Sequence, residues 1–382
     1  MNWFVIADDI TGAAEIAGIA LGFGCCVRFT TSVERLTLGD GVTVLATDTR
    51  SMPRTEAVAV TERIVARLRA AAPNGLPDGV RLFKKTDSVL RGHVTAELRA
   101  LMTAGYERAL LLPANPSKGR CIVGGRYLLG GEPIDRTVFR TDPEFPAATA
   151  DVVELLGGGV HYVDSVTERL AEGISIGETP SVEALAALAA RFGGDAPLWA
   201  GAADAFRVLL AADGRTERPQ EPFAGFGDSR TLVVCGSTVR HDLSAEPFFR
   251  RRRVAVAPMP DAVFEGAEPT AWIAAARQRM EAERADALLL RIPQQVRVDG
   301  ARARRLRGAM ARTVQALVAA ERFDEVVIEG GATAYAVLDA LGWHDFVVTD
   351  AVAAGVVRLR YPAADVYLTF KPGSYDWGAA FR

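Results

Sequence analysis

Short apolar runs alternate with stretches of helical periodicity in the first 115 residues. The runs cover residues 3–7, 42–46, 81–83 and 109–112, and the stretches between them space their apolar residues as a helix does. Continuous apolar runs joined by helices are typical of parallel strands, because each crossover lays a helix on the sheet. We therefore predict that this part of the chain forms an α/β fold with a parallel sheet covered on both faces.

The alternation resumes after a long interruption. Residues 116–150 are rich in Gly, Pro and charge, and a loop of this length usually serves a site. Residues 216–230 contain helix and strand breakers with few aliphatic residues, which marks a domain boundary. We predict an N-terminal domain over residues 1–222 and a C-terminal domain over 223–382, each with a mainly parallel sheet and helices on both faces. The strands expected in the second are 231–234, 253–257, 287–291, 325–328, 346–348 and 365–370.

The composition narrows the class of protein. A chain of 382 residues, 49% hydrophobic and 24% charged, is long enough for two cores and typical of a globular protein. The net charge of −3 argues against a broad basic surface for nucleic acid or an anionic membrane. We expect neither a signal peptide nor a membrane-spanning helix. The four cysteines form no CxxC pair, which favours a reduced, cytoplasmic location.

Charged and hydroxyl side chains follow every apolar run of the first part. They are Asp8 and Asp9 after the first run; Asp48, Arg50 and Ser51 after the second; Lys84, Lys85, Asp87, Ser88 and Arg91 after the third; and Asn115, Lys118 and Arg120 after the fourth. Ligands of open α/β sheets bind where the strands end, because loops and helix N-termini converge there. The third cluster combines cations for an anionic substrate with a carboxylate for hydroxyls or proton transfer.

Each cluster also has a purely structural interpretation, which the sequence leaves open. An aspartate at the start of a helix caps it, which applies to Asp8 and Asp9. The third cluster can form a solvated network of ion pairs, and the segment from Asp48 to Ser51 can be a turn. The arginines at 250–253 and at 302, 304, 305 and 307 are interpreted as solvated faces, since no aromatic platform accompanies them.

Glycine turns follow strands of the second part. Gly236 and Ser237 follow one strand, Gly330 to Thr333 follow another, and Gly373 follows the last. Glycine lets the backbone approach a ligand closely and leaves amides free at the next helix start, so the three turns together predict an anion or nucleotide cradle. The chain lacks a GxxxxGK(S/T) loop, a GxGxxG loop after its first strand and a GxSxG elbow, and its four histidines have no metal-ligand spacing.

Taken together, the motifs resemble the four-carbon acid sugar kinase family. They are ADDITGAAEIAG, DTRS, KKTDSVLRGHVTAEL, PANPSKGR and TVFRTDPEFP, followed by VVCGS, EGGAT and LTFKPGSYDWG. The resemblance implies an ATP-dependent kinase of threonate, erythronate or oxo-tetronate in carbohydrate catabolism, with the sugar acid in the N-terminal domain and ATP in the other. The ATP contacts that it implies are Ser237, Gly330, Gly331, Ala332, Thr333 and Gly373. The family usually carries Asp where Glu15 stands, Ser or Gly in place of Ala334, and Thr and Gln after the GS of VVCGS.

This resemblance leads to specific expectations for the site, which we place in a cleft between the domains. Lys84, Lys85 and Arg91 would hold the substrate carboxylate. Asp8, Asp9, Asp48 and Arg50 would bind its hydroxyls, with Ser51 and Ser88 beside them. Asp87 is the first choice as the base for the attacking hydroxyl, and Asp9 is the second. Mg²⁺ is expected with ATP, held mainly by phosphates and water, and no protein ligand is assigned to it.

Two other functions stay open on the sequence alone. One is an ATP-independent sugar-acid lyase, isomerase or aldolase that uses the same acidic and basic residues. The other is a sensor that binds sugar acids or nucleotides without turnover. A small-molecule substrate is expected in each case, with neither nucleic acid nor membrane as partner, and a homodimer is the default assembly.

Overall fold

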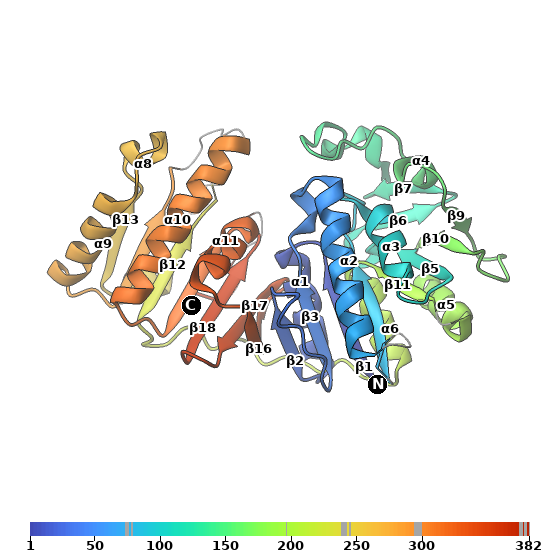
Figure 1. Cartoon of the computed structure of the whole chain (residues 1–382), viewed down its shortest axis with the longest axis horizontal. Helices are drawn as coiled ribbons and strands as arrows, with labels where there is room; N and C mark the ends of the chain where they lie inside the picture. The colour runs from blue at the N-terminus through green and yellow to red at the C-terminus, as the bar shows by residue number, and fades with distance from the viewer. Residues whose placement is uncertain are drawn as a thin grey trace. The chain divides into compact units, whose positions relative to one another are not determined.

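The computed structural model describes residues 1–72, 76–77, 79–195, 197–237, 243, 246–293, 300–373, 377 and 380–381. The chain divides into two compact units, Met1–Arg218 and Pro219–Arg382. The boundary that we predict, after residue 222, lies in the segment that follows this division. Each unit contains a mostly parallel sheet flanked by helices, so the predicted α/β class is confirmed (Figure 1). No helix of the described residues is long and apolar enough to cross a membrane.

The sheet of the N-terminal unit is parallel in every strand pair that the structure describes. Its strands are β1 (Asn2–Ala7), β2 (Val27–Thr30), β3 (Val42–Ala46), β4 (Val80–Lys85), β5 (Arg108–Leu112), β9 (His161–Val163), β10 (Gly173–Gly177) and β11 (Leu198–Gly201). The order across the sheet is β2-β3-β1-β4-β11-β5-β10-β9. The four apolar runs found in the sequence are therefore the strands β1, β3, β4 and β5.

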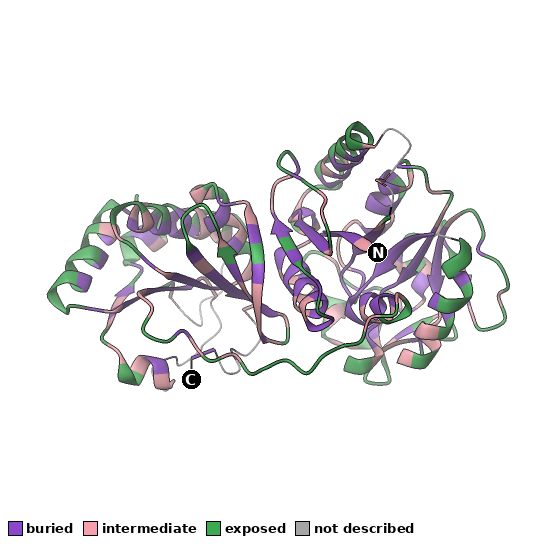
Figure 2. Ribbon diagram, turned by 90° about the horizontal axis from the view of Figure 1, so that it is seen from below, coloured by how far each residue is buried: buried purple, intermediate pink, exposed green. Residues whose placement is uncertain are grey.

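Helices cover both faces of this sheet. They are α1 (Ile10–Gly22), α2 (Arg54–Ala71), α3 (Val94–Met102), α4 (Val152–Leu155), α5 (Val182–Phe192) and α6 (Ala203–Ala212). Helix α2 packs on α3, whereas α1 and α5 pack on α6. The strands between these layers are almost entirely buried, while the outer helix faces are exposed (Figure 2). This two-sided burial is why the strands are continuous apolar runs and do not alternate with polar residues.

The long interruption after β5 forms a small antiparallel sheet. Its strands are β6 (Arg120–Val123), β7 (Arg126–Leu129) and β8 (Glu132–Pro133), and short 3-10 turns follow as far as Thr141. Tyr127 and Ile134 are buried in the main core, so the excursion is a packed part of the N-terminal unit.

The C-terminal unit has a second sheet in the order β13-β14-β12-β15-β18-β17-β16. Its strands are β12 (Thr231–Cys235), β13 (Val254–Pro258), β14 (Ala287–Arg291), β15 (Glu325–Glu329), β16 (Asp345–Ala353), β17 (Val356–Tyr361) and β18 (Val366–Lys371). Strand β17 runs antiparallel to both of its neighbours and was not predicted from the sequence. The helices are α7 (Pro247–Arg251), α8 (Asp261–Glu265), α9 (Thr270–Ala282), α10 (Gly300–Ala320) and α11 (Gly331–Leu341).

A buried carboxyl at the start of β15 makes the stability of the C-terminal unit depend on pH. Glu325 is fully buried, and its Oε1 accepts a hydrogen bond of 2.7 Å from Nε of Arg358. The guanidinium of Arg358 lies 3.6 Å from the ring centroid of Tyr367. Burial raises the pKa of Glu325 to about 7 from its usual 4.5, although the ion pair with Arg358 opposes the rise.

We expect the free energy of unfolding to fall as the pH rises from about 4.5 to about 7. In this window the folded chain holds the Glu325 proton more tightly than the unfolded chain, so the stabilisation is complete below pH 4.5 and lost as the pH passes 7. Across this window the free energy of unfolding falls by about 3 kcal/mol, since each pKa unit corresponds to about 1.36 kcal/mol. Urea denaturation at several pH values measures it, and Glu325→Gln should flatten the dependence. An equal slope in both proteins would refute the assignment.

Candidate functional site

The strands β3, β1 and β4 are neighbours in the sheet, and their carboxyl ends carry the polar clusters singled out in the sequence. Asp8 and Asp9 follow β1, the segment from Asp48 to Ser51 follows β3, and the segment from Asp87 to Arg91 follows β4. Parallel strands end at one edge, so three segments far apart in the sequence meet there. We refer to Asp8, Asp9, Arg50, Asp87 and Arg91 as the acid–arginine cluster.

Arg50 is at the centre of this cluster. Its Nε and Nη2 each donate a 2.9 Å hydrogen bond to Asp8, and its Nη1 and Nη2 donate bonds of 2.9 and 2.8 Å to Asp9. The Oδ1 of Asp87 lies 3.7 Å from Nη1. The loop after β4 contacts Arg50 at Gly92, whose φ of 92° is a backbone conformation that favours glycine. The guanidinium of Arg50, which follows β3, thus binds carboxylates that follow β1 and β4.

Asp9 combines two roles. Its Oδ1 accepts a 2.8 Å bond from the amide of Gly12, and Oδ2 accepts one from the hydroxyl of Thr11, so Asp9 caps α1. With the two bonds from Arg50, each of its oxygens accepts two donors. A carboxylate has about four lone-pair positions, so Asp9 has little capacity left for a ligand. The capping interpretation is confirmed for Asp9, whereas Asp8 accepts from Arg50 with both oxygens and is buried.

Asp87 is held as a carboxylate by several donors. Its Oδ2 accepts a 2.9 Å bond from Nε of Arg91 and bonds of 3.2 Å from the amides of Val89 and Arg91. Its Oδ1 accepts one 3.0 Å bond from Nη2 of Arg91. Burial favours the protonated form, but Arg50 and Arg91 outweigh it and hold the pKa of Asp87 well below its usual range. The remaining acceptor capacity of Asp87 is therefore on Oδ1.

The two lysines of β4 point in opposite directions, as neighbours on a strand must. Lys84 is 1% exposed and forms an ion pair with Glu97 of α3. Lys85 lies 3.6 Å from Glu15 of α1 and donates a 3.0 Å bond to the carbonyl of Thr86. The structure places the ammonium of Lys84 in the core beside Glu97, a position that does not support the expectation that it holds a substrate carboxylate.

Glu15 was noted in the sequence only as a departure from the family pattern. Its Oε1 lies 2.7 Å from Nζ of Lys118, in the turn after β5, and its Oε2 faces Lys85. Burial raises the pKa of Glu15, but the two lysines outweigh this effect and leave it below the usual value. Glu15 thus links α1 to the ends of β4 and β5.

The excursion after β5 also contributes to this edge. Asp142 lies 3.6 Å from Nη1 of Arg91, and Glu144 accepts a 3.0 Å bond from the hydroxyl of Ser51. Both acidic residues belong to the TVFRTDPEFP motif, but the sequence did not indicate their partners. Ser51 is exposed, and Ser88 is buried with its hydroxyl bonded to Arg120. Asp48 is half-buried and has a left-handed backbone, with a φ of 54°.

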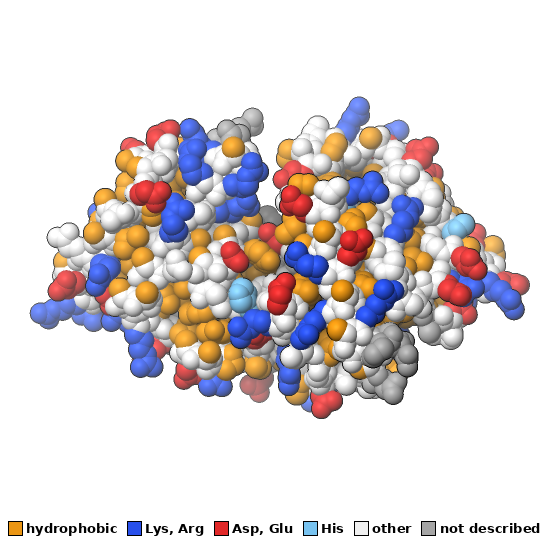
Figure 3. Space-filling model, in the orientation of Figure 1, with side chains coloured by type: hydrophobic (Ala, Val, Ile, Leu, Met, Phe, Trp, Pro, Cys, Tyr) orange, Lys and Arg blue, Asp and Glu red, His pale blue; other side chains and the backbone are white. Residues whose placement is uncertain are grey.

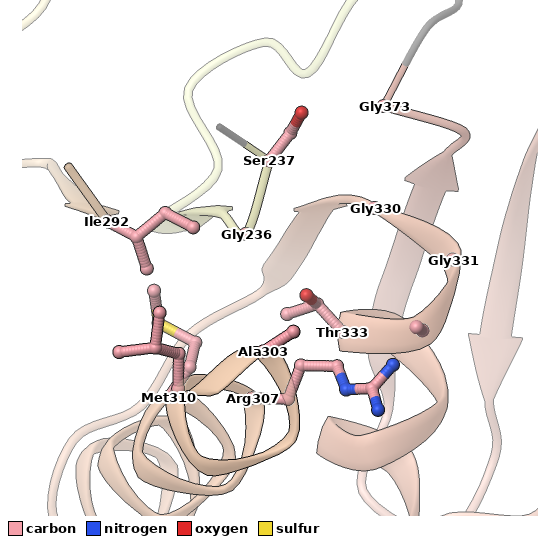
Figure 4. Close-up of a pocket in the computed structure, with 12 residues that line it drawn as sticks. Gly236, Ser237, Ile292, Ala303, Arg307, Met310, Gly330, Gly331, Thr333 and Gly373 are labelled. Atoms are coloured by element: carbon pink, nitrogen blue, oxygen red, sulfur yellow. The ribbon is translucent and has the colours of Figure 1, made fainter. Parts of the chain in front are cut away.

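In the C-terminal unit, glycine turns lie at the carboxyl ends of neighbouring strands, where the N-terminal unit has its acid–arginine cluster. Strands β12, β15 and β18 are neighbours, and their ends place Gly236, Ser237, the Gly330 turn and Gly373 around one pocket (Figure 4). The pocket has a volume of about 310 Å³. We call it the glycine pocket; its lining residues are Gly236, Ser237, Ile292, Ala303, Leu306, Arg307, Met310, Gly330, Gly331, Ala332, Thr333 and Gly373.

The backbone of the glycine pocket needs its glycines. Gly330 has a φ of 106° immediately before α11, a conformation that side chains disfavour. A Cβ on Gly236 would lie 2.1 Å from Oγ1 of Thr333, and one on Gly373 would lie 2.8 Å from Oγ of Ser237. The first amides of α11 have no acceptor within the helix, and Gly330 has no side chain to cap them. No side chain of the described residues caps this helix start, so its amides can receive an anion.

Helix α10 supplies one wall of the glycine pocket, which no motif of the sequence indicates. Ala303, Leu306, Arg307 and Met310 lie on one face of this helix, at spacings of three and four residues. Arg307 is half-buried and lines the pocket, so it differs from Arg304 and Arg305, which are exposed as a solvated face predicts. Residues 238–242, where the family pattern also differs, lie outside the described residues.

Metal ligation has no ready-made site in the part of the chain that is described. There, no group of three or more His, Cys, Asp or Glu side chains is arranged to hold a metal ion. The acidic residues of the acid–arginine cluster are instead bound to arginines.

Comparisons with known proteins agree with this division into two sites. Residues 3–203 match the family model of a sugar-binding N-terminal domain, and residues 248–375 match that of a nucleotide-binding C-terminal domain. The D-threonate kinase of Cupriavidus necator is 30% identical, with 95% of this chain and 91% of that protein covered. The 3-oxo-tetronate kinase of Methylobacterium radiotolerans is 29% identical, with 98% and 96% covered.

The fold is also found among solved structures. A crystal structure of a Haemophilus influenzae protein matches with a TM-score of 0.74 at 19% identity, covering 98% of this chain and 97% of that chain. This likeness supports the fold, and the family follows from the sequence matches. Two consecutive domain models and a relative that is 30% identical over almost its whole length establish that the chain belongs to the four-carbon acid sugar kinase family.

Proposed function

We propose that this protein is an ATP-dependent kinase that phosphorylates a hydroxyl of a four-carbon sugar acid of the threonate, erythronate or oxo-tetronate type, in carbohydrate catabolism. One observation carries the proposal. The unit that matches a sugar-binding domain gathers carboxylates and cations at one sheet edge, and the unit that matches a nucleotide-binding domain has the glycine pocket at the corresponding edge. The curated relatives that match along the whole chain are kinases of such acids.

The substrate carboxylate is assigned to Arg91 and Lys85. The side chain of Arg91 is one-third exposed, so it can reach a ligand while its pairs with Asp87 and Asp142 persist. Lys85 is also buried, at 3% exposed, and it supplies a second positive charge at this edge from its place beside Glu15. Guanidinium groups bind carboxylates with two parallel hydrogen bonds, which fixes the orientation of the acid.

The hydroxyls of the acid are assigned to Asp8, Asp48, Arg50 and Asp87, with Ser51 and Ser88 beside them. Asp87 receives the attacking hydroxyl on Oδ1, where it has acceptor capacity. Its low pKa makes it chiefly a group that orients the hydroxyl and accepts the proton late, as the γ-phosphorus forms its bond to the oxygen and the bond to ADP breaks. Asp9 supports the cluster from its capped position, and its saturated oxygens make it a poor second base.

ATP is assigned to the glycine pocket, with contacts from Ser237, Gly330, Gly331, Ala332, Thr333 and Gly373. Amides at the start of α11 suit phosphate oxygens, because the N-terminus of a helix is positively polarised. Mg²⁺ would enter with the nucleotide, held by its phosphates and by water. The cytoplasmic location and the homodimer stay predictions.

An assay of ADP release tests the proposed function. The full chain is incubated with ATP·Mg²⁺ and each of D-threonate, L-threonate, D-erythronate and 3-oxo-tetronate, and the acid is analysed for a phosphate ester. We expect one acid to be phosphorylated in proportion to the ADP released. Conversion of an acid without nucleotide would instead identify a lyase or isomerase. Tight binding of acids without any turnover would identify a sensor.

Replacing Gly236 with alanine tests the assignment of the glycine pocket. The added Cβ would collide with Thr333, so we expect the affinity for ATP to fall about 5- to 100-fold. The KM for the sugar acid should change little. Gly308→Ala is the matched control, because a Cβ there meets only the end of Arg312 at 3.5 Å. Calorimetric titration with ATP measures the effect, and equal affinities in both variants would contradict the assignment.

A further inference from the structure

The glycine pocket contains a cation that has no acidic partner within the described part of the chain. Arg307 of α10 lines the pocket and is half-buried. Among the residues that the structure describes, no carboxylate lies within ion-pair distance of its guanidinium. Other half-buried arginines of the chain, such as Arg50 and Arg358, are each bound to carboxylates. A guanidinium that is partly withdrawn from water, and that no described carboxylate neutralises, favours the arrival of an anion.

The direction of the Arg307 side chain indicates which part of the ligand it meets. Figure 4 shows Arg307 extending from α10 toward the first turn of α11, next to Thr333, while Ile292 and Met310 lie on the other side of the pocket. The amides of Gly331 and its neighbours begin α11 there. One side of the pocket is therefore positively polarised and the other is apolar.

We infer that Arg307 binds a phosphate group of the nucleotide, which it holds against the start of α11. This inference rests on the proposed function and adds a residue that the sequence motifs do not contain. The apolar side formed by Ile292, Leu306 and Met310 takes the base, because a flat aromatic ring gains from burial against aliphatic side chains. Phosphate oxygens are negatively charged and accept two parallel hydrogen bonds from one guanidinium. The base is uncharged, so the phosphate is the better partner for Arg307.

The surroundings of Arg307 supply a matched control. Lys and Arg side chains gather over the start of α10 (Figure 3). Arg304 is on the same helix, one turn earlier, but it is exposed and does not line the pocket. Removing either charge alters the net charge of the unit equally, so a difference between the two variants reports the local contact and not long-range attraction.

The test compares nucleotides that differ only in their phosphates. Adenosine, AMP, ADP and ATP·Mg²⁺ are titrated into the full chain and into Arg307→Met, Arg307→Lys and Arg304→Met. For Arg307→Met we expect a loss of affinity of about 10- to 100-fold for ADP or ATP, with adenosine unchanged. Arg307→Lys should recover part of the loss, since it restores the charge without the planar fork. Arg304→Met should bind like the natural protein.

The outcomes separate this inference from the function on which it rests. An equal loss of affinity for adenosine and ATP would mean that Arg307 only packs against the ligand. An unchanged affinity for every nucleotide would show that Arg307 makes no contact with it. Either result overturns the inference but leaves the proposed kinase function intact. Failure of the natural protein to bind ATP would overturn both. Melting temperatures show whether Arg307→Met is folded, and if it is not, the selective loss is read from Arg307→Lys.

Discussion

Replacing Arg50 with methionine is expected to lower the free energy of unfolding by about 3–5 kcal/mol. The substitution leaves Asp8, Asp9 and Asp87 close together without the guanidinium that they share. Buried carboxylates that lose their cation repel one another and must take up protons or water, which shifts the balance toward the unfolded chain. The loops after β1, β3 and β4 should separate as a result.

The same change should reduce kcat/KM for the sugar acid about 100- to 1000-fold, the size usual for the loss of one preorganised electrostatic contact. Urea denaturation and steady-state kinetics measure the two effects. Arg54→Met, on the exposed start of α2, is the control for removing an arginine nearby. Arg50→Lys retains the charge but cannot serve both Asp8 and Asp9, so it should recover stability more than activity. Activity within threefold of the natural protein in Arg50→Met would remove Arg50 from the site.

The sequence predicted the fold because burial on both faces leaves a simple pattern. The runs at 3–7, 42–46, 81–83 and 109–112 are the strands β1, β3, β4 and β5, and polar residues follow each of them. The order of the strands depends on the crossovers, which no local pattern records. That β3, β1 and β4 lie side by side had to come from the structure.

The sequence pattern misplaced Lys84 for an identifiable reason. The apolar run ends at Phe83, so both lysines were placed in the loop, whereas β4 continues to Lys85. A strand directs successive side chains to opposite faces, and only one of two adjacent lysines can face α1. Lys84 is tolerated in the core because Glu97, which is also buried, neutralises it from α3. Glu97 stands 13 residues after Lys84 in the same motif, but the sequence does not show which of the two lysines it pairs with.

The sequence did not distinguish Arg307 from the other arginines around it. Several arginines surround it on α10, and their abundance suggests a solvated face. The apolar positions Leu306 and Met310 share a face with Arg307, but this pattern also fits an ordinary helix that packs on a sheet. Only the position of α10 beside the glycine turns makes that face a pocket wall.

Replacing Asp87 with asparagine is expected to lower kcat about 100- to 10,000-fold. Asparagine keeps the shape but cannot accept a proton, and it weakens the bonds to Arg91 and to the acceptor hydroxyl. The KM for ATP should stay unchanged, because the nucleotide is assigned to the other unit. Asp142→Asn is the matched control, since Asp142 is the other carboxylate beside Arg91. Turnover of Asp87→Asn close to that of the natural protein would exclude Asp87 from catalysis.

The pH dependence distinguishes an orienting carboxylate from a base that titrates near neutrality. The folded pKa of Asp87 is held below its unfolded value of 3.8, so its stabilising effect is complete above that pH and is lost as the pH falls through the folded pKa. Asp87 therefore stays ionised wherever the enzyme is active, and the profile of kcat/KM should show no acid limb from it between about pH 5 and 9. Acid denaturation below about pH 4 should be less steep in Asp87→Asn than in the natural protein. An acid limb near neutral pH that disappears in Asp87→Asn would mean that the bound substrate displaces Arg91 and frees Asp87 to act as an ordinary base.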